Sequence, residues 1–228
     1  MKTIRFLPAA LLALAAAYPS AAPAQTPAPK PRVSFDARTL PKNATEEKIL
    51  AVIDDVFATQ RRGSMSVPTH DGRILRVLAE SVGAKHVVEL GTSVGYSGLW
   101  FSLALKVTGG KLTTFEIDKE RAAKARANFK RAGVDDIITL VEGDAHVEVV
   151  KIKEPIDILF LDADKEGYID YLTKLLPLVK PGGLIVAHNM VERMAHPPYL
   201  EAITTNPALE TVFINLSESG IGVTLKKR

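Results

Sequence analysis

The chain has 228 residues, of which 46% are hydrophobic and 24% charged, a composition typical of one globular domain with a sizeable core. Its formal net charge of +3 includes Lys2 and Arg5, which lie in a segment expected to be removed, so the remaining chain is nearly neutral. This charge gives no basis for binding nucleic acid or an anionic membrane surface. The absence of cysteine excludes disulfides, thiolate catalysis and zinc–cysteine sites.

Residues 1–24 have the pattern of an export signal peptide. Lys2 and Arg5 form a basic start, an apolar run from Phe6 to Tyr18 follows, and Ala22-Pro23-Ala24 offers the small residues of a cleavage site. The run is shorter than the about 20 apolar residues of a membrane span. We therefore expect a periplasmic or secreted protein with no membrane contact after cleavage. The alternative is a wrongly assigned start, which would make the protein cytoplasmic.

A proline-rich linker, residues 25–44, is expected to precede the folded domain, residues 45–228. Thr45 is a candidate N-cap for the first helix, and Pro68 and Gly72 are expected to bracket a turn. Apolar spacing and glycine positions predict helices at residues 45–60, 73–82, 96–107, 119–132, 145–151, 165–178 and 198–205. Strands are predicted at residues 87–90, 111–117, 137–141, 156–161, 183–187, 211–216 and 221–225.

The order of these elements predicts an α/β fold. Strands and helices alternate from residue 87 to residue 187, which is typical of a parallel sheet with helices on both faces. The last two strands flank the short polar turn Ser217–Gly220 and should form a hairpin, so the final strand runs antiparallel. The prediction is a Rossmann-like, doubly wound sheet of about seven strands, mostly parallel, with an antiparallel C-terminal hairpin strand.

The segment Val87–Gly98 has the layout of a nucleoside-binding unit. A short apolar strand breaks at Gly91, a helix starts after Gly95, and Glu116 ends the next strand. Glycines allow a tight turn and close approach to a ligand, and a carboxylate at the second strand's end can hold ribose hydroxyls. The spacing therefore predicts a site for a nucleoside-containing cofactor.

Polar residues also follow the other strands, at the end of the sheet where ligands bind in such folds. They are Gly143-Asp144-Ala145, Asp162-Ala163-Asp164-Lys165 and His188-Asn189. Each has a structural explanation when taken alone: Glu116 or Asp144 could cap a helix, Lys165 could be solvated and His188 could be a satisfied buried histidine. Five consecutive strand ends of this kind favour one shared ligand site.

Several motifs together resemble one family. The glycine segment, FEID (115–118), EGDA (142–145), LFLDADKEGYIDY (159–171) and LVKPGGLIVAHN (178–189) occur in this order and spacing. The chain is similar over roughly residues 46–225 to class I S-adenosylmethionine-dependent O-methyltransferases of the catechol and caffeoyl-CoA type, bacterial members included. MSVP (65–68) matches the segment that closes over the cofactor in that family.

The resemblance implies S-adenosylmethionine as the cofactor. Gly91 and Thr92 would pass beside its methionine part, Val67 and Ser97 would contact its amino-acid group, and Glu116 would bind the ribose. Ala145 and Asp144 would flank the adenine. The full set implied for the cofactor is Val67, Glu89, Gly91, Thr92, Gly95, Tyr96, Ser97, Glu116, Ile117, Asp144, Ala145 and Asp162.

The resemblance also implies the catalytic residues and a divalent metal. Lys165 matches the general base, and Asp162 and Asn189 match metal ligands, but His188 stands where the family usually has a third ligand, aspartate. Magnesium prefers oxygen ligands, whereas manganese, iron or zinc accept imidazole. Three outcomes are open: a changed metal preference, a weak metal site, or a metal-free enzyme with His188 as the base.

The leading hypothesis is an O-methyltransferase acting on a small phenolic or catechol-like acceptor, in a homodimer as is frequent in the family. One alternative is an exported, catalytically weakened cofactor-binding protein, because S-adenosylmethionine is made inside cells. Another is a dehydrogenase, against which the incomplete Gly-x-Gly-x-x-Gly motif and LDADK (161–165) argue. Trp100, Tyr168 and Tyr171 are expected to serve packing.

Overall fold

The computed structural model describes residues 37–61 and 63–228, so the predicted signal peptide lies outside the described residues. One compact unit, Thr39–Arg228, contains the helices and strands of the described chain. The helices of this unit are α1 (Ala44–Gln60), α2 (Thr69–Ser81), α3 (Tyr96–Thr108), α4 (Lys119–Ala132), α5 (Ala145–Glu148), the 3₁₀ helix η1 (Val149–Lys151), α6 (Tyr168–Leu175) and α7 (Pro197–Thr204).

The sheet has seven strands in the order β3-β2-β1-β4-β5-β7-β6. They are β1 (His86–Leu90), β2 (Lys111–Glu116), β3 (Ile138–Glu142), β4 (Ile156–Leu161), β5 (Val179–His188), β6 (Leu209–Ile214) and β7 (Ile221–Lys226). Neighbouring strands from β3 to β5 pair in parallel, whereas β7 pairs antiparallel with both β5 and β6. The predicted fold class, including the antiparallel C-terminal hairpin, is confirmed.

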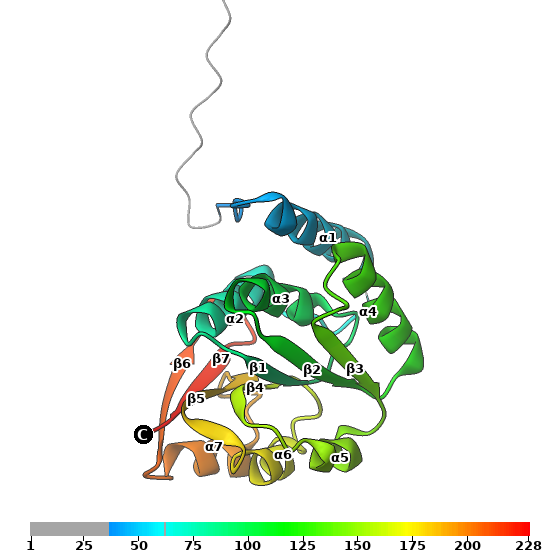
Figure 1. Ribbon diagram of the computed structural model, residues 1–228. Coiled ribbons are helices and arrows are strands. Elements are labelled where there is room, and N and C mark those ends of the chain that lie inside the picture. The colour runs from blue at the N-terminus through cyan, green and yellow to red at the C-terminus, as the bar shows by residue number, and fades with distance from the viewer. Residues whose placement is uncertain (1–36, 62) are drawn as a thin grey trace, which may run out of the picture. The chain divides into compact units, whose positions relative to one another are not determined.

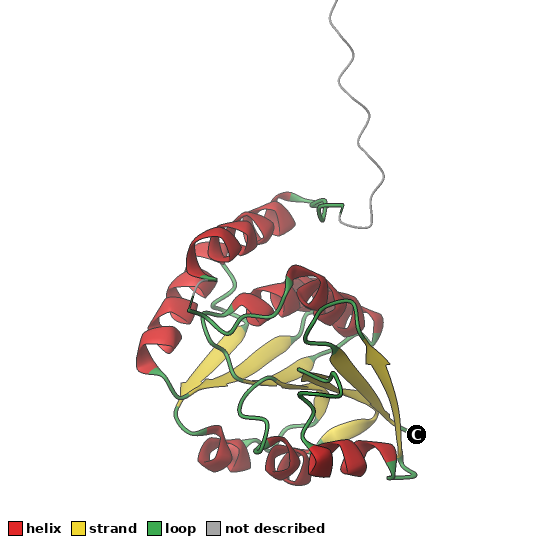
Figure 2. Cartoon of the chain, turned by 180° about the vertical axis from the view of Figure 1, so that it is seen from behind, coloured by secondary structure: helices red, strands yellow, loops and turns green. Residues whose placement is uncertain are grey.

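Helices cover both faces of the sheet (Figure 1). Helices α1 to α4 lie on one face and α5 to α7 on the other, and Figure 2 shows the same three layers from behind. Along β4, Ile158 and Phe160 belong to the core under the first layer, and Leu159 and Leu161 to the core under the second. This period of two is that of a strand buried on both faces, which explains its uninterrupted apolar sequence.

Helix α2 begins earlier than the sequence indicated. It starts at Thr69, so Asp71 and Gly72 lie within the helix instead of in a turn before it. A Cβ atom at residue 72 would overlap the indole ring of Trp100 on α3, so Gly72 serves close helix packing. Trp100 is buried, as predicted. This correction matters for the site, because it fixes where Asp71 points.

Several other boundaries differ from the prediction, among them the start of β5, which is Val179 instead of residue 183. The N-cap of α1 is Asn43, whose Oδ1 accepts a hydrogen bond of 3.0 Å from the Glu46 N–H, and not Thr45. Helix α6 begins at Tyr168, because Lys165 to Gly167 form a turn before it. Among the described residues, none of the helices is both long and apolar enough to cross a membrane.

Candidate functional site

The turn after β1 is built by two glycines in the left-handed region. Gly91 has φ of +96° and Gly95 of +86°, and the N–H groups of Gly91 and Thr92 both donate to the Phe115 carbonyl. A Cβ atom on Gly91 would overlap the backbone carbonyl of Asp162. Glycine at this position therefore allows the β1 turn to lie directly against the end of β4.

Glu116 holds this turn from the end of β2. One carboxylate oxygen accepts from the Ser93 N–H at 2.7 Å, and the other accepts from the Asp118 N–H at 2.9 Å. Ser93 adopts a φ of +49°, which is unfavourable for a residue with a Cβ atom. Each oxygen of a carboxylate can accept more than one hydrogen bond, so Glu116 retains acceptor capacity for ligand hydroxyls.

A buried carboxylate lies beneath the turn. Glu89 is fully buried, and its two oxygens accept hydrogen bonds from Ser97 at 2.5 Å and Thr114 at 2.6 Å. Thr92 extends this network through the Thr114 hydroxyl. Burial raises the pKa of Glu89 to about 7 despite these hydrogen bonds. Both donors are uncharged hydroxyl groups. Among the described residues, no cationic side chain therefore forms a hydrogen bond or ion pair with Glu89.

The remaining predicted cofactor residues come from four other segments of the chain. Asp144 caps α5 by accepting from the His146 N–H at 2.9 Å, and Ala145 follows it, half-buried. Ile117 leaves 70% of its surface exposed beside Glu116. Val67 is buried, and the Tyr96 ring packs edge-on against Trp100. Ile117 is thus an exposed apolar surface next to a polar anchor, which suits a flat ring.

Lys165 lies at the end of β4, beside Asp162. Its Nζ donates to the Ala163 carbonyl at 3.1 Å and to the Tyr168 hydroxyl at 3.0 Å, and lies 3.6 Å from Asp162 Oδ1. Burial lowers the pKa of Lys165, while the charge of Asp162 acts in the opposite direction. Tyr168 is buried, as is Tyr171, in agreement with their predicted packing role. The arrangement gives a lysine that is partly desolvated and rigidly held.

His188 lies between two carboxylates at the end of β5. Its Nδ1 is 3.1 Å from Asp162 Oδ1, and its Nε2 is 3.1 Å from Asp71 Oδ2. Burial lowers the pKa of His188, but the two hydrogen-bonded carboxylates outweigh it and raise the pKa to about 9. The histidine is therefore a cation at neutral pH.

Asp71 is a site residue that the sequence analysis did not identify. It comes from α2, it is 1% exposed, and its Oδ2 also accepts from the Ser217 hydroxyl at 2.9 Å. The other carboxylate oxygen, Oδ1, is buried without a hydrogen-bond partner. An acidic residue before a glycine is typical of a turn, which concealed this role. Only a helix starting at Thr69 would have indicated that Asp71 faces inward.

The residues at this end of the sheet do not fit the divalent metal that the resemblance implies. A metal binds an imidazole through a nitrogen lone pair, and each nitrogen of His188 already has a carboxylate oxygen as its partner at 3.1 Å. Asp162 shares its Oδ1 between His188 and Lys165. Asn189 follows, half-buried, with a φ of +61°. Within residues 37–61 and 63–228, no group of three acidic, histidine or cysteine residues has the geometry of a metal site.

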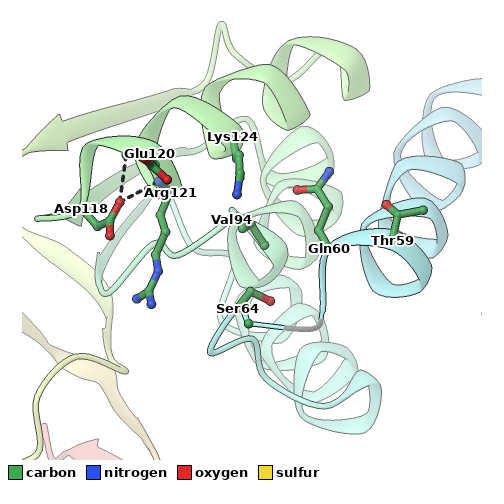
Figure 3. A pocket seen from close by; sticks show the side chains of 9 residues that line it. Thr59, Gln60, Ser64, Val94, Asp118, Glu120, Arg121 and Lys124 are labelled. Atoms are coloured by element: carbon green, nitrogen blue, oxygen red, sulfur yellow. Dashed lines mark hydrogen bonds between the residues drawn. The ribbon is translucent and has the colours of Figure 1, made fainter.

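The structure thus brings Asp162, Lys165 and His188 into contact, with Glu89 and Glu116 on the neighbouring strands. A pocket of about 620 Å³ lies next to the glycine turn, at Val94 (Figure 3). Arg121 and Lys124 reach into it from α4. None of its lining residues belongs to the predicted site. Acidic and basic side chains both line it, so its charge singles out no ligand.

Comparison with known proteins decides the family. Residues 41–194 match the sequence model of a family described as O-methyltransferase. The chain belongs to this family. Catechol O-methyltransferase of Niastella koreensis is 34% identical over 169 residues, which cover 72% of this chain and 75% of that protein. Caffeoyl-CoA O-methyltransferase of Medicago sativa is 32% identical over 146 residues, which cover 61% of this chain and 59% of that protein.

Solved structures agree with this assignment. The O-methyltransferase from Bacillus cereus, solved in complex with S-adenosylhomocysteine, superposes with a TM-score of 0.67 at 26% identity, covering 82% of this chain and 93% of that one. S-adenosylhomocysteine is what S-adenosylmethionine becomes after giving up its methyl group. The protein is an S-adenosylmethionine-dependent O-methyltransferase, and the predicted family, activity and cofactor are confirmed.

Proposed function

We propose that this methyltransferase acts on the hydroxyl of a small phenolic or catechol-like acceptor, next to Lys165. The observation that carries the proposal is the contact of Lys165 and Asp162 at the end of β4, on the same sheet edge as Glu116 and Glu89. The named activities of the relatives from Niastella koreensis and Medicago sativa support this acceptor class. In this proposal, the proton acceptor Lys165 lies at the same end of the sheet as Glu116, the residue proposed to bind the cofactor's ribose.

For the cofactor, we assign the ribose to Glu116 and the amino-acid group to Glu89, Ser97 and Val67. Both Glu116 oxygens are oriented by backbone N–H groups and retain lone pairs for two vicinal hydroxyls. Glu89 is a buried carboxylate that would gain a counter-ion from the ammonium group of the ligand. Gly91, Thr92 and Gly95 would let the backbone approach the methionine part. Ile117, Asp144 and Ala145 would border the adenine.

Methyl transfer is a displacement in which the acceptor oxygen attacks the methyl carbon and the carbon–sulfur bond breaks. The electron pair of that bond stays on sulfur, so the sulfonium becomes a neutral thioether as the new oxygen–carbon bond forms. The acceptor proton goes to Lys165 Nζ, which must be neutral to accept it. Burial lowers the pKa of Lys165 in that direction. The protein then has to align acceptor and methyl group, which Asp162 and the glycine turn support through their direct contact.

Two measurements test this function. Isothermal titration calorimetry should detect binding of S-adenosylmethionine and not of NAD. Incubation with a panel of monohydroxy and dihydroxy phenols should give methylated products by mass spectrometry. Cofactor binding without methylation of any phenol would exclude the proposed acceptor class. Binding of NAD in place of S-adenosylmethionine would contradict the cofactor assignment.

We also propose that the enzyme is exported and forms a homodimer. The basic start, apolar run and small cleavage residues of residues 1–24 support export. Mass spectrometry of the native protein should then give an N-terminus at Gln25, and an intact leader would contradict export.

The homodimer is tested separately. Light scattering coupled to gel filtration should give twice the mass of one chain, and a single-chain mass would exclude the dimer.

A further inference from the structure

The environment of His188 differs from that of a metal ligand or a general base. A general base or a ligand needs a free nitrogen lone pair. An ionised carboxylate only accepts hydrogen bonds, so with Asp162 and Asp71 both ionised these two contacts require a proton on each ring nitrogen. A histidine between two carboxylates therefore favours the imidazolium form.

The burial of Asp71 supports the same charge independently. Asp71 is almost completely buried, and a buried carboxylate is stable only beside a cation or a dense set of donors. Its contacts are His188 Nε2 and the Ser217 hydroxyl, while Oδ1 has no hydrogen-bond partner. A neutral His188 would leave this carboxylate uncompensated in the core. The buried carboxylate of Asp71 and the positive charge of His188 thus stabilise each other.

The position of this cation is the third point. His188 lies where the resemblance implies a metal-ligating aspartate, and it contacts Asp162, which the resemblance also implies as a ligand. Lys165 is the basic group next to this carboxylate, with its Nζ 3.6 Å from the oxygen that His188 contacts. The positive charge of the site is thus built into the protein chain.

We propose that the His188 imidazolium, fixed between Asp162 and Asp71, takes the place of the divalent metal, so that this enzyme transfers methyl groups without one. Its catalytic part rests on the proposed function. His188 acts as a positioning residue: it holds the Asp162 side chain beside Lys165 through the contact of its Nδ1 with Oδ1. Asp71 anchors the imidazolium from α2, and Ser217 anchors Asp71 from the turn between β6 and β7.

This arrangement also predicts the breadth of the acceptor class. A bound metal selects catechols because it can hold two vicinal oxygens at once. Both N–H groups of His188 are already used by carboxylates, so the imidazolium gives a second acceptor hydroxyl no comparable anchor. We therefore expect kcat/KM for a catechol and for the matched monophenol, such as caffeate and 4-hydroxycinnamate, to differ by less than about tenfold.

The decisive experiment measures Mn²⁺ binding to the metal-stripped wild-type enzyme by calorimetry and electron paramagnetic resonance, with and without S-adenosylmethionine. We expect no saturable one-to-one binding. EDTA should change kcat/KM by less than about twofold. His188→Asp should gain one Mn²⁺ site, because it restores an oxygen ligand beside Asp162 and Asn189. His188→Asn, which adds no carboxylate at the same position, is the matched control and should not gain tight binding.

Stoichiometric Mn²⁺ binding to the wild type that is lost in His188→Asn would overturn the proposal. So would a loss of activity of at least about 10²-fold in EDTA that Mn²⁺ reverses. Mn²⁺ binding is measured without an acceptor, so a failure of the proposed acceptor class leaves this test intact. If His188→Asp does not fold, as judged by circular dichroism, the wild-type binding measurement still decides.

Discussion

Two histidines of this enzyme each contact two aspartates, one in the core and one at the surface. His188 contacts Asp162 and Asp71 at 3.1 Å each, and the three side chains are 6%, 10% and 1% exposed. A lysine completes the group, since Lys165 lies 3.6 Å from Asp162. We call these four residues the buried cluster.

The second group comes from α5, from α6 and from the loop between β4 and α6. His146 contacts Asp170 at 2.6 Å and Asp164 at 3.3 Å, and the three side chains are 36%, 38% and 54% exposed. Lys174 lies 2.6 Å from Asp170, and the imidazole stacks on a tyrosine ring. The hydrogen bond to Asp170 raises the pKa of His146 in the same direction as that of His188. We call His146, Asp164, Asp170 and Lys174 the surface cluster.

The comparison shows that the same pairing has different consequences at different depths. At the surface, water can solvate any member that loses its partner, so such pairs contribute about 0–1 kcal/mol. In the core, removing one partner leaves an unsolvated charge, which costs about 3–5 kcal/mol. Composition and contact pattern are alike in the two clusters. The difference in burial alone therefore predicts different energetic consequences for the two clusters.

The largest expected difference concerns the two lysines. Lys165→Ala should lower kcat by about 10²–10⁴-fold, because it removes the proposed proton acceptor, with an unchanged dissociation constant for S-adenosylmethionine. Lys174→Ala should leave kcat within about twofold, since it alters only an exposed ion pair. Steady-state kinetics and calorimetry on both variants check this. Equal losses in the two variants would remove the distinction between the clusters.

Stability should separate the two histidines next. His188→Asn should lower the free energy of unfolding by about 3–5 kcal/mol, because the carboxylate of Asp71 remains buried without a cation. His146→Asn should lower it by less than about 1 kcal/mol. Urea unfolding followed by circular dichroism measures both values. A loss of less than about 1 kcal/mol in His188→Asn would mean that the carboxylate of Asp71 does not depend on the charge of His188.

The pH dependence of stability should follow the buried histidine. The folded pKa of His188 is about 9, above the ordinary value of 6.5, so its contribution is fully present below about pH 6.5 and lost as the pH rises through about 9. That contribution is about 3 kcal/mol. The stability difference between wild type and His188→Asn should therefore shrink over this range. His146→Asn, measured in parallel, should show a smaller change, and equal changes would contradict the role of burial.

A third buried carboxylate sharpens the comparison. Asp71 has its cation within the chain, whereas Glu89 is held only by hydroxyl groups and has a pKa of about 7. If the cofactor supplies the missing cation, Glu89→Gln should weaken S-adenosylmethionine binding by about tenfold. Wild-type affinity should also fall as the pH drops through 7, because protonated Glu89 loses its charge. Calorimetry across this range would exclude the assignment if affinity stayed constant.

The sequence predicted the residues at the strand ends, but it did not predict which residues from distant elements contact them. Glu116, Asp162 and His188 follow apolar runs whose length and spacing are characteristic of buried strands, so their common edge could be inferred from alternation alone. Asp71 could not be found this way. It lies 117 positions before His188 on a helix of another layer, and no local pattern encodes a contact of that range.

The role of His188 was also beyond local reasoning. The residue type left a metal ligand and a base open, because both depend on a free nitrogen. Only the structure shows that each ring nitrogen has a carboxylate partner, one on each side of the ring. In the same way, Gly72 suggested a turn, although its lack of a side chain serves the packing of α2 on Trp100. The roles of His188 and Gly72 are decided by their burial and by contacts with residues far away in the sequence.

The most direct test of the account is the protonation state of the two histidine rings by nuclear magnetic resonance. Long-range proton–nitrogen correlation spectra, assigned with His188→Asn and His146→Asn, report each ring nitrogen separately. The account predicts that His188 carries protons on both nitrogens at neutral pH and titrates at about 9, at a pH unchanged by added Mn²⁺. A neutral His188 ring near pH 7, or a resonance lost on adding stoichiometric Mn²⁺, would contradict it.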